Sequence, residues 1–282
     1  MASVNVESIG KIVKFIRCRV KLTPTVGIIC GSGLGKLADA VNHSITIPYK
    51  EIPGFPQCTV AGHKGNLVFG TFGTKNVVVM QGCFHGYEGY SSEEITIPIR
   101  VMKLLGVGTI LISNAAGGLN TKLKRGDLVI IKDHISMPSL GLQRALVGPN
   151  DERFGPRFMT TSDVYDEQLR RLMLKIASEK GLENSVHEGV YCFCGGPNYE
   201  TPAEARMLAM MGGDIIGMST VPEVTVARYC GILVLAVSIV TNLAVMDVDE
   251  KVPEVSHEEV LEEADKRAVV LQDLFTDLVK RM

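Results

Sequence analysis

The chain has 282 residues, of which 46% are apolar and 21% charged, and its 29 basic and 31 acidic side chains leave a formal net charge of -2. This length is enough to bury the core of one large domain. The balanced charge argues against a polyanion-binding surface, so we expect no nucleic-acid partner.

The N-terminal residues 1–21 predict an amphipathic helix. Charges are scattered through this segment without a central apolar block, so it does not have the pattern of a signal peptide. The most apolar run, residues 230–246, is interrupted by Ser238, Thr241 and Asn242 and is too short for a membrane span. We therefore expect a cytoplasmic protein without a membrane partner.

The cysteine content indicates reduced thiols. There are seven cysteines, several lie in apolar runs, and no CxxC pair occurs. An odd number of apolar-flanked cysteines is typical of a reducing compartment. We expect buried structural thiols and no metal site.

Short β-branched runs alternate with helical patterns along the rest of the chain. The predicted strands are residues 25–30, 76–82, 108–113, 127–132, 189–194 and 232–242. Their continuous apolar character is typical of strands buried on both faces. Two alternating runs within 66–82 flank Gly73-Thr74-Lys75 and predict an antiparallel hairpin. The pattern favours an α/β fold with a mixed central sheet, in a single domain spanning 1–282.

Three capping boxes predict where helices begin: Ser91 with Glu94, Thr201 with Glu204, and Ser256 with Glu259. Residues 137–158 are rich in proline and glycine and predict a long loop. Loops of this length in a compact enzyme are usually functional.

Turns of small residues are expected after several strands, at residues 31–35, 114–118 and 219–220. Glycine allows close approach of the backbone, and a helix N-terminus favours an anion. Ligands of open α/β folds bind beyond the carboxyl ends of strands, so these turns predict an anion site. A dinucleotide fingerprint is disfavoured because Lys36 stands where its third glycine is required.

Three polar or aromatic residues mark a second candidate region. Glu200 stands one residue before the Thr201 cap, where it can either serve the helix dipole or bind a ligand. The adjacent Tyr199 can offer a ring face to a flat ligand. Asn242 ends the most buried strand, and its amide requires a hydrogen bond, either structural or to a ligand.

These motifs, in chain order, resemble those of the trimeric purine nucleoside phosphorylases. The matching segments are GSGLG (31–35), VAGHKGNLVFG (60–70), HGYEGY (85–90), LLGVGTILISNAAGGLN (104–120), GPRF (155–158), GGPNYETPAE (195–204), GMSTVPEV (217–224), TN (241–242) and SHEEV (256–260). The resemblance implies a partly barrel-like sheet flanked by helices. It also implies that phosphate attacks C1′ of a purine (deoxy)ribonucleoside, which gives the free base and (deoxy)ribose 1-phosphate. Phosphate is then a co-substrate, and no cofactor or metal is expected.

The resemblance also implies the site residues. The phosphate ligands are Ser32, His85, Ser219 and the main-chain N–H of Ala115. The base contacts are Tyr199, Glu200 and Asn242, and the catalytic residues are His85, Glu200 and Asn242. The ribose contacts are Tyr87, Met218, His257 and Phe158. Phe158 comes from a neighbouring subunit, which implies a homotrimer, and His63 belongs to a flexible loop near the site.

The chain departs from the family pattern at Cys83, where an arginine is usual. A charge-assisted hydrogen bond contributes roughly 1.5–3 kcal/mol, so its loss predicts phosphate binding weaker by about one to two orders of magnitude. Gly86 and Leu243 replace larger or charged residues. These two changes predict a looser base site that accepts 6-aminopurines or pyrimidines.

Two other functions are weighed against this one. A methylthioadenosine phosphorylase carries an aspartate where this chain has Asn242. A nucleoside-binding protein without catalysis is favoured only by Cys83, because this residue removes a phosphate ligand.

Overall fold

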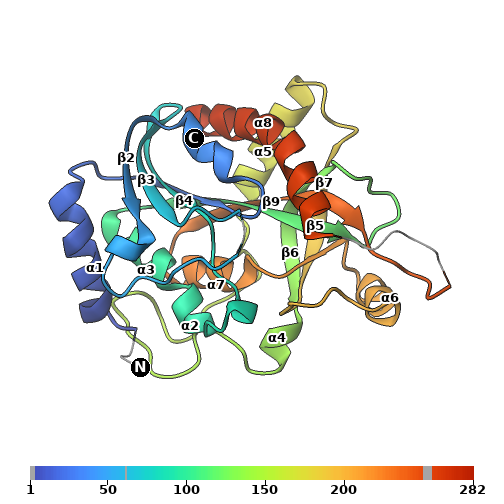
Figure 1. Ribbon diagram of the computed structural model, residues 1–282, viewed down its shortest axis with the longest axis horizontal. Helices are drawn as coiled ribbons and strands as arrows, with labels where there is room; N and C mark the ends of the chain where they lie inside the picture. The colour runs from blue at the N-terminus through green and yellow to red at the C-terminus, as the bar shows by residue number, and fades with distance from the viewer. Residues whose placement is uncertain (1–3, 61, 250–255) are drawn as a thin grey trace.

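The computed structural model describes residues 4–60, 62–249 and 256–282, and within them the strands form one nine-stranded mixed sheet (Figure 1). The strands are β1 (Val26–Cys30), β2 (Asn42–Pro48), β3 (Asn66–Phe72), β4 (Lys75–Gln81), β5 (Thr109–Gly118), β6 (Leu128–Ser136), β7 (Val186–Phe193), β8 (Ile215–Gly217) and β9 (Leu233–Leu243). Their order is β2-β3-β4-β1-β5-β8-β7-β6-β9, and β9 pairs back onto β5. The last five strands therefore close into a ring, which confirms the expected mixed, partly barrel-like sheet.

Parallel and antiparallel pairs alternate irregularly across the sheet. Strand β1 pairs in parallel with β4 and β5, and β9 pairs in parallel with β5. Strands β3 and β4 form the predicted antiparallel hairpin. Strand β8 runs antiparallel to β5 but parallel to β7.

The helices cover both faces of the sheet. They are α1 (Val6–Arg19), α2 (Ser92–Ile95), α3 (Ile97–Leu105), α4 (Met137–Leu140), α5 (Glu167–Glu179), α6 (Pro202–Met210), α7 (Val221–Tyr229) and α8 (His257–Arg281), with short 3-10 helices at Gly35–Ala40, Tyr49–Glu51 and Gly86–Glu88. Helices α5 and α8 pack together on one side, and α1, α3 and α7 pack on the other (Figure 1). In the part of the chain that the structure describes, no helix combines the length and apolar character that crossing a membrane requires.

Strand β1 shows how this layering follows from the sequence. All five of its residues are buried. Ile29 belongs to the apolar cluster shared with α1, α3 and α7, whereas Ile28 and Cys30 belong to the cluster shared with α5 and α8. Successive side chains of a strand point to opposite faces, so a continuous apolar run fills two cores at once.

The helix starts follow the predicted caps. Ser91 and Thr201 form reciprocal capping boxes with Glu94 and Glu204. The Ser256 hydroxyl accepts a hydrogen bond of 3.1 Å from the Glu259 N–H. Each cap satisfies N–H groups that the first helical turn otherwise leaves without a partner.

Strand β2 was not predicted from the sequence. Most of it is exposed, and it pairs only with β3. Its pairing shifts register between Asn42 and Ile45, and His43 within this bulge has φ 52°. An exposed strand with a bulge lacks the apolar periodicity that identifies a strand.

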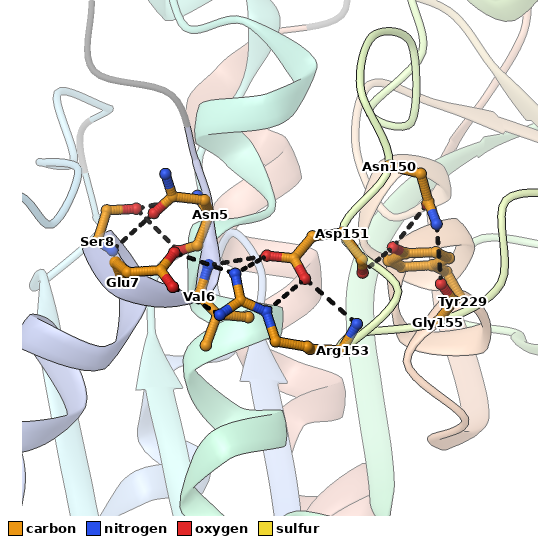
Figure 2. Close-up of polar contacts among 9 residues, drawn as sticks. All are labelled: Asn5, Val6, Glu7, Ser8, Asn150, Asp151, Arg153, Gly155 and Tyr229. Carbon is orange, nitrogen blue, oxygen red and sulfur yellow. Dashed lines mark hydrogen bonds and ion pairs between the residues drawn. The ribbon is translucent and has the colours of Figure 1, made fainter.

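The long loop 137–158 is largely irregular, as predicted, and its end is tied to the N-terminal helix (Figure 2). The Arg153 guanidinium lies 2.5 Å from a Glu7 carboxylate oxygen and 2.7 Å from an Asp151 carboxylate oxygen. The Tyr229 hydroxyl lies 2.8 Å from the Asp151 carbonyl oxygen. These contacts fix the loop just before Phe158.

Candidate active site

A cavity of about 640 Å³ opens between the carboxyl ends of β1 and β8, which pair with successive parts of the same edge of β5. This volume is in the range of small-molecule sites. The lining contains most of the expected site residues: Ser32, Cys83, His85, Tyr87, Ala115, Tyr199, Glu200, Met218, Ser219 and Asn242. Apart from Ala115, which lies in β5, they come from segments that follow β1, β4, β7 and β8 or lie near the end of β9, as expected for a switch point of an α/β sheet.

Residues 114–118 were predicted as a turn, and this prediction was wrong. They continue β5, which runs from Thr109 to Gly118 and pairs with β9 along its length. Along its other edge, β5 pairs with β1 up to Ser113 and with β8 from Gly117. Residues 114–116 thus have no strand partner on that edge, and there they line the cavity. The glycines leave room for side chains of the neighbouring strands, because a Cβ would lie 3.2 Å from Ile216 Cγ2 at Gly117 and 2.8 Å from Leu243 Cδ2 at Gly118.

His85 is held by the carboxylate of Glu88. The Glu88 Oε1 atom accepts from the His85 main-chain N–H at 2.9 Å and lies 2.8 Å from Nδ1. Burial alone would raise the pKa of Glu88, but hydrogen bonds from His85 and Thr59 outweigh it and lower this pKa to about 2. The ionised carboxylate can only accept, so Nδ1 carries a proton. The Tyr87 ring stacks on the imidazole with ring centroids 4.6 Å apart.

Cys83 occupies the position beside this histidine. Its Sγ lies 3.6 Å from His85 Nε2, and the residue is only 4% exposed. Burial, and then the charge of Glu223, raise the pKa of the Cys83 thiol well above its usual value. Cys83 is therefore a neutral thiol and not an activated nucleophile.

His63 connects this region to Ser32. Its Nε2 lies 3.2 Å from Ser32 Oγ, and its Nδ1 lies 3.2 Å from the Cys83 carbonyl oxygen. His63 itself is outside the cavity lining. Gly82, with φ 112°, leaves the space for it, because a Cβ at this glycine would lie 2.8 Å from His63 Cβ.

Glu200 also lines the cavity. Burial and the neighbouring Glu204 charge raise the pKa of Glu200. The Glu204 carboxylate itself is engaged by the Thr201 N–H at 2.8 Å and the Thr201 hydroxyl at 2.9 Å. Tyr199 lines the cavity while remaining 42% exposed. Glu200 is thus the acidic group available to a ligand here.

Asn242 is the next-to-last residue of β9 and pairs with Gly117 of β5. Its Oδ1 lies 3.1 Å from the Thr241 hydroxyl. A Cβ at Gly117 would lie 3.3 Å from the Asn242 Nδ2, so only glycine leaves ample room for this amide. When the Thr241 hydroxyl donates to Oδ1, the Asn242 Nδ2 is free to donate to a ligand.

Two expected ribose contacts are not placed in this cavity. Phe158 is 89% exposed and absent from the lining. His257 is the first residue of α8, and its side chain lies outside the described part of the chain.

Sequence reasoning missed the apolar wall of the cavity. Its members come from α4, the end of β7 and α6, and are Met137, Pro138, Cys194, Met207 and Leu208. They carry no motif, and only the fold brings them together. Asn114, which also lines the cavity, was quoted within a motif without a role.

The comparison with known proteins identifies the family. A family model described as the phosphorylase superfamily matches residues 25–280. Purine nucleoside phosphorylase of Rattus norvegicus is 45% identical over 274 residues, which cover 97% of this chain and 94% of the relative. The chain belongs to the purine nucleoside phosphorylases of this superfamily.

Solved structures of this family agree over the whole chain. A crystal structure of Schistosoma mansoni purine nucleoside phosphorylase with adenosine has a TM-score of 0.96 and 54% identity, and covers 100% of this chain and 99% of that one. Isoform 2 from the same organism, with cytosine and ribose 1-phosphate, has a TM-score of 0.95 and 52% identity, with 100% and 98% covered.

Proposed function

We propose that this purine nucleoside phosphorylase catalyses the reversible phosphorolysis of purine (deoxy)ribonucleosides and so acts as a pentosyltransferase. A phosphate oxygen forms the bond to C1′ while the bond from C1′ to purine N9 breaks. The electron pair of that bond moves into the base. Free base and (deoxy)ribose 1-phosphate are the products, and phosphate is the co-substrate without a further cofactor.

The arrangement of the cavity carries this proposal. Hydroxyl and imidazole groups of Ser32, His85 and Ser219 gather near the unpaired edge of β5 at Ala115. Donors of this kind suit a phosphate dianion. The amide and carboxyl groups of Asn242 and Glu200 suit a base whose ring gains charge as it leaves.

The base contacts have separate roles in the proposal. Asn242 Nδ2 donates to N7 of the leaving purine, where negative charge accumulates. The ionised Glu200 carboxylate accepts the N1–H of a 6-oxopurine. The Tyr199 ring packs on the base, and Tyr87, Met218 and His257 contact the ribose.

The test is phosphate-dependent loss of inosine, followed in the ultraviolet. We expect saturable turnover that requires phosphate, and Asn242→Ala should lower kcat by about 100-fold, as removal of one stabilising donor does in other enzymes. Thr276→Ala, which removes a hydroxyl on α8 outside the site, is the matched control. Binding of inosine without turnover at any phosphate concentration would instead identify a nucleoside-binding protein.

We further propose that phosphate is bound weakly. Among the described residues that line the cavity there is no lysine or arginine, and neutral Cys83 stands where the family usually has arginine. Cys83→Arg should lower the KM for phosphate by about 10-fold or more, because it adds a charge-assisted hydrogen bond. Cys83→Met is the control for added volume without charge. An unchanged phosphate KM in the arginine variant refutes this proposal.

The base range is proposed to extend beyond inosine and guanosine. A Cβ at Gly86 would meet nothing within 4 Å, and Leu243 is 44% exposed. Similar proteins have been crystallised with adenosine and with cytosine. Turnover of inosine, guanosine, adenosine, cytidine and uridine, compared at one phosphate concentration, tests this range. Activity confined to inosine and guanosine contradicts it.

The assembly is proposed to be a homotrimer of single-domain chains. Phe158 is almost fully exposed at the end of an anchored loop, where a neighbouring subunit can cover it against its own ribose site.

All nine described strands belong to one sheet, which supports one domain over 1–282. The seven cysteines are all free thiols, which supports a cytoplasmic location. A methylthioadenosine phosphorylase is disfavoured because Asn242 replaces its aspartate.

A further inference from the structure

Thr220 has a strained backbone directly beside the proposed phosphate ligand Ser219. Its φ is 77° and its ψ is -51°. The Val221 N–H donates to the Ser219 carbonyl oxygen at 2.9 Å and closes a γ-turn around Thr220. A γ-turn with positive φ is rare and strained, and a β-branched residue is especially unfavourable there. Such a conformation persists only where the surroundings enforce it.

A buried hydrogen bond holds this turn. The Asn114 Nδ2 atom donates to the Thr220 hydroxyl at 2.8 Å, and the two residues are 2% and 1% exposed. The same hydroxyl lies 3.2 Å from Ser219 Oγ. The Ser219 N–H donates to the Tyr191 hydroxyl at 3.4 Å. Ser219 is therefore held by contacts with the hydroxyls of Thr220 and Tyr191.

Asn114 also touches the first turn of the site. A Cβ at Gly31 would lie 3.1 Å from the Asn114 Cα, so the segment leading to Ser32 packs directly on this asparagine. Asn114 precedes Ala115 in β5. One side chain thus lies between the segments that carry three of the four proposed phosphate ligands.

The Asn114 amide forms fewer hydrogen bonds than it could. Its Oδ1 is buried without a hydrogen-bond partner among the described residues. An unpaired buried amide oxygen is costly and, in a native fold, often accompanies a functional constraint. The arrangement therefore favours the bond to Thr220 over full satisfaction of the amide.

We propose that Thr220 is a positioning residue of the phosphate site. Its hydroxyl, held by Asn114, maintains the strained γ-turn, and the turn directs Ser219 Oγ toward phosphate. The inference rests on the proposed function, since it takes Ser219 as a phosphate ligand. It adds a residue that shapes the phosphate site without touching phosphate.

The first experiment compares Thr220→Val, which removes the hydroxyl at constant shape, with Thr220→Ser, which keeps it. Thr220→Val should raise the KM for phosphate by about 10-fold while the KM for inosine stays within about twofold. Thr220→Ser should restore the phosphate KM. Thr225→Val is the matched control, because it removes a hydroxyl of α7 whose hydrogen bond, among the described residues, is to the Val221 carbonyl oxygen at 2.8 Å.

The second experiment measures the strain without relying on activity. Thr220→Gly and Thr220→Ala both lack the hydroxyl, but only glycine adopts positive φ freely. We expect the glycine variant to unfold at a temperature at least about 2 °C above that of the alanine variant. If the thermal unfolding midpoint of Thr220→Gly is equal to or lower than that of Thr220→Ala, the backbone at Thr220 is not strained.

The outcomes separate this inference from the proposed function. Wild-type protein that shows no phosphate-dependent turnover refutes the proposed function. Saturable phosphate use by the wild type, with an unchanged phosphate KM in Thr220→Val, refutes the positioning role alone. Equal rises in the phosphate and inosine KM values would indicate general loss of structure and would also refute it.

Discussion

Glu223, in the first turn of α7, gives the most quantitative prediction for stability. Its side chain is only 4% exposed, and its Oε2 has no hydrogen-bond partner among the described residues. Burial raises the pKa of Glu223 from 4.5 to about 7 in the folded protein. The unfolded chain keeps the ordinary value. Between these two pH values the unfolded state releases a proton that the folded state retains.

The sign and size of the effect follow from proton linkage. Because the folded state binds more protons in this interval, the free energy of unfolding falls as pH rises. The slope approaches about 1.4 kcal/mol per pH unit, so the accumulated cost above pH 7 is about 3 kcal/mol. Glu223→Gln cannot ionise and removes this cost. The stability of the glutamine variant relative to wild type should therefore rise by roughly 2–3 kcal/mol between pH 5 and pH 8.

The assay is urea unfolding followed by circular dichroism, because the chain has no tryptophan for fluorescence. Protein concentration stays fixed so that any subunit association contributes equally. Glu152→Gln, at an exposed loop position, is the control. Its free energy of unfolding should change with pH in parallel with that of wild type. Parallel pH profiles for Glu223→Gln and wild type would show that the buried carboxyl does not titrate as reasoned.

Two further predictions concern charge within the site. Glu88→Gln should raise the KM for phosphate by about 10-fold, because the Glu88 carboxylate holds the His85 imidazole in place through its contacts with the main-chain N–H at 2.9 Å and Nδ1 at 2.8 Å. Steady-state kinetics check this, with Glu94→Gln, in a capping box outside the cavity, as control; equal KM values for both variants contradict it. Protonated Glu200 can donate to N1 of a 6-aminopurine and accept from its amino group, so the ratio of kcat/KM for adenosine to that for inosine should rise as pH falls. The measurement is this ratio of kcat/KM values as a function of pH, in wild type and in Glu200→Gln. If the ratio depends on pH in the same way in both proteins, Glu200 is not the group that controls the choice of base.

The sequence predicted the regular parts of the fold well. The apolar strands and the hairpin at 66–82 lie where periodicity placed them, because their burial is determined by local pattern. The extension of β5 through Gly118 was missed, since alanine and glycine read as a turn when no neighbour is known. Only the pairing with β9 and β8 shows that residues 114–118 adopt a β-strand conformation.

The sequence indicated the polar residues that line the cavity better than its apolar wall. Motifs such as GSGLG and PNYE can be recognised in the sequence itself. Burying their polar groups costs free energy unless these groups form hydrogen bonds, so such motifs indicate a binding site. Met137 and Met207 belong to separate segments, and their meeting depends on how α4 and α6 pack. Thr220 was also beyond sequence reasoning, since positive φ is unexpected for threonine.

The ring of five strands also affects how copies of this chain meet. Closure onto β5 leaves β2 as the terminal strand of the sheet among the described residues. A straight terminal strand offers a row of unpaired backbone groups on which another chain can add. The bulge at His43 interrupts that row, so the one open edge is a poor template for edge-to-edge aggregation. The irregular strand that sequence patterns overlooked thus disfavours edge-to-edge pairing between copies of this chain.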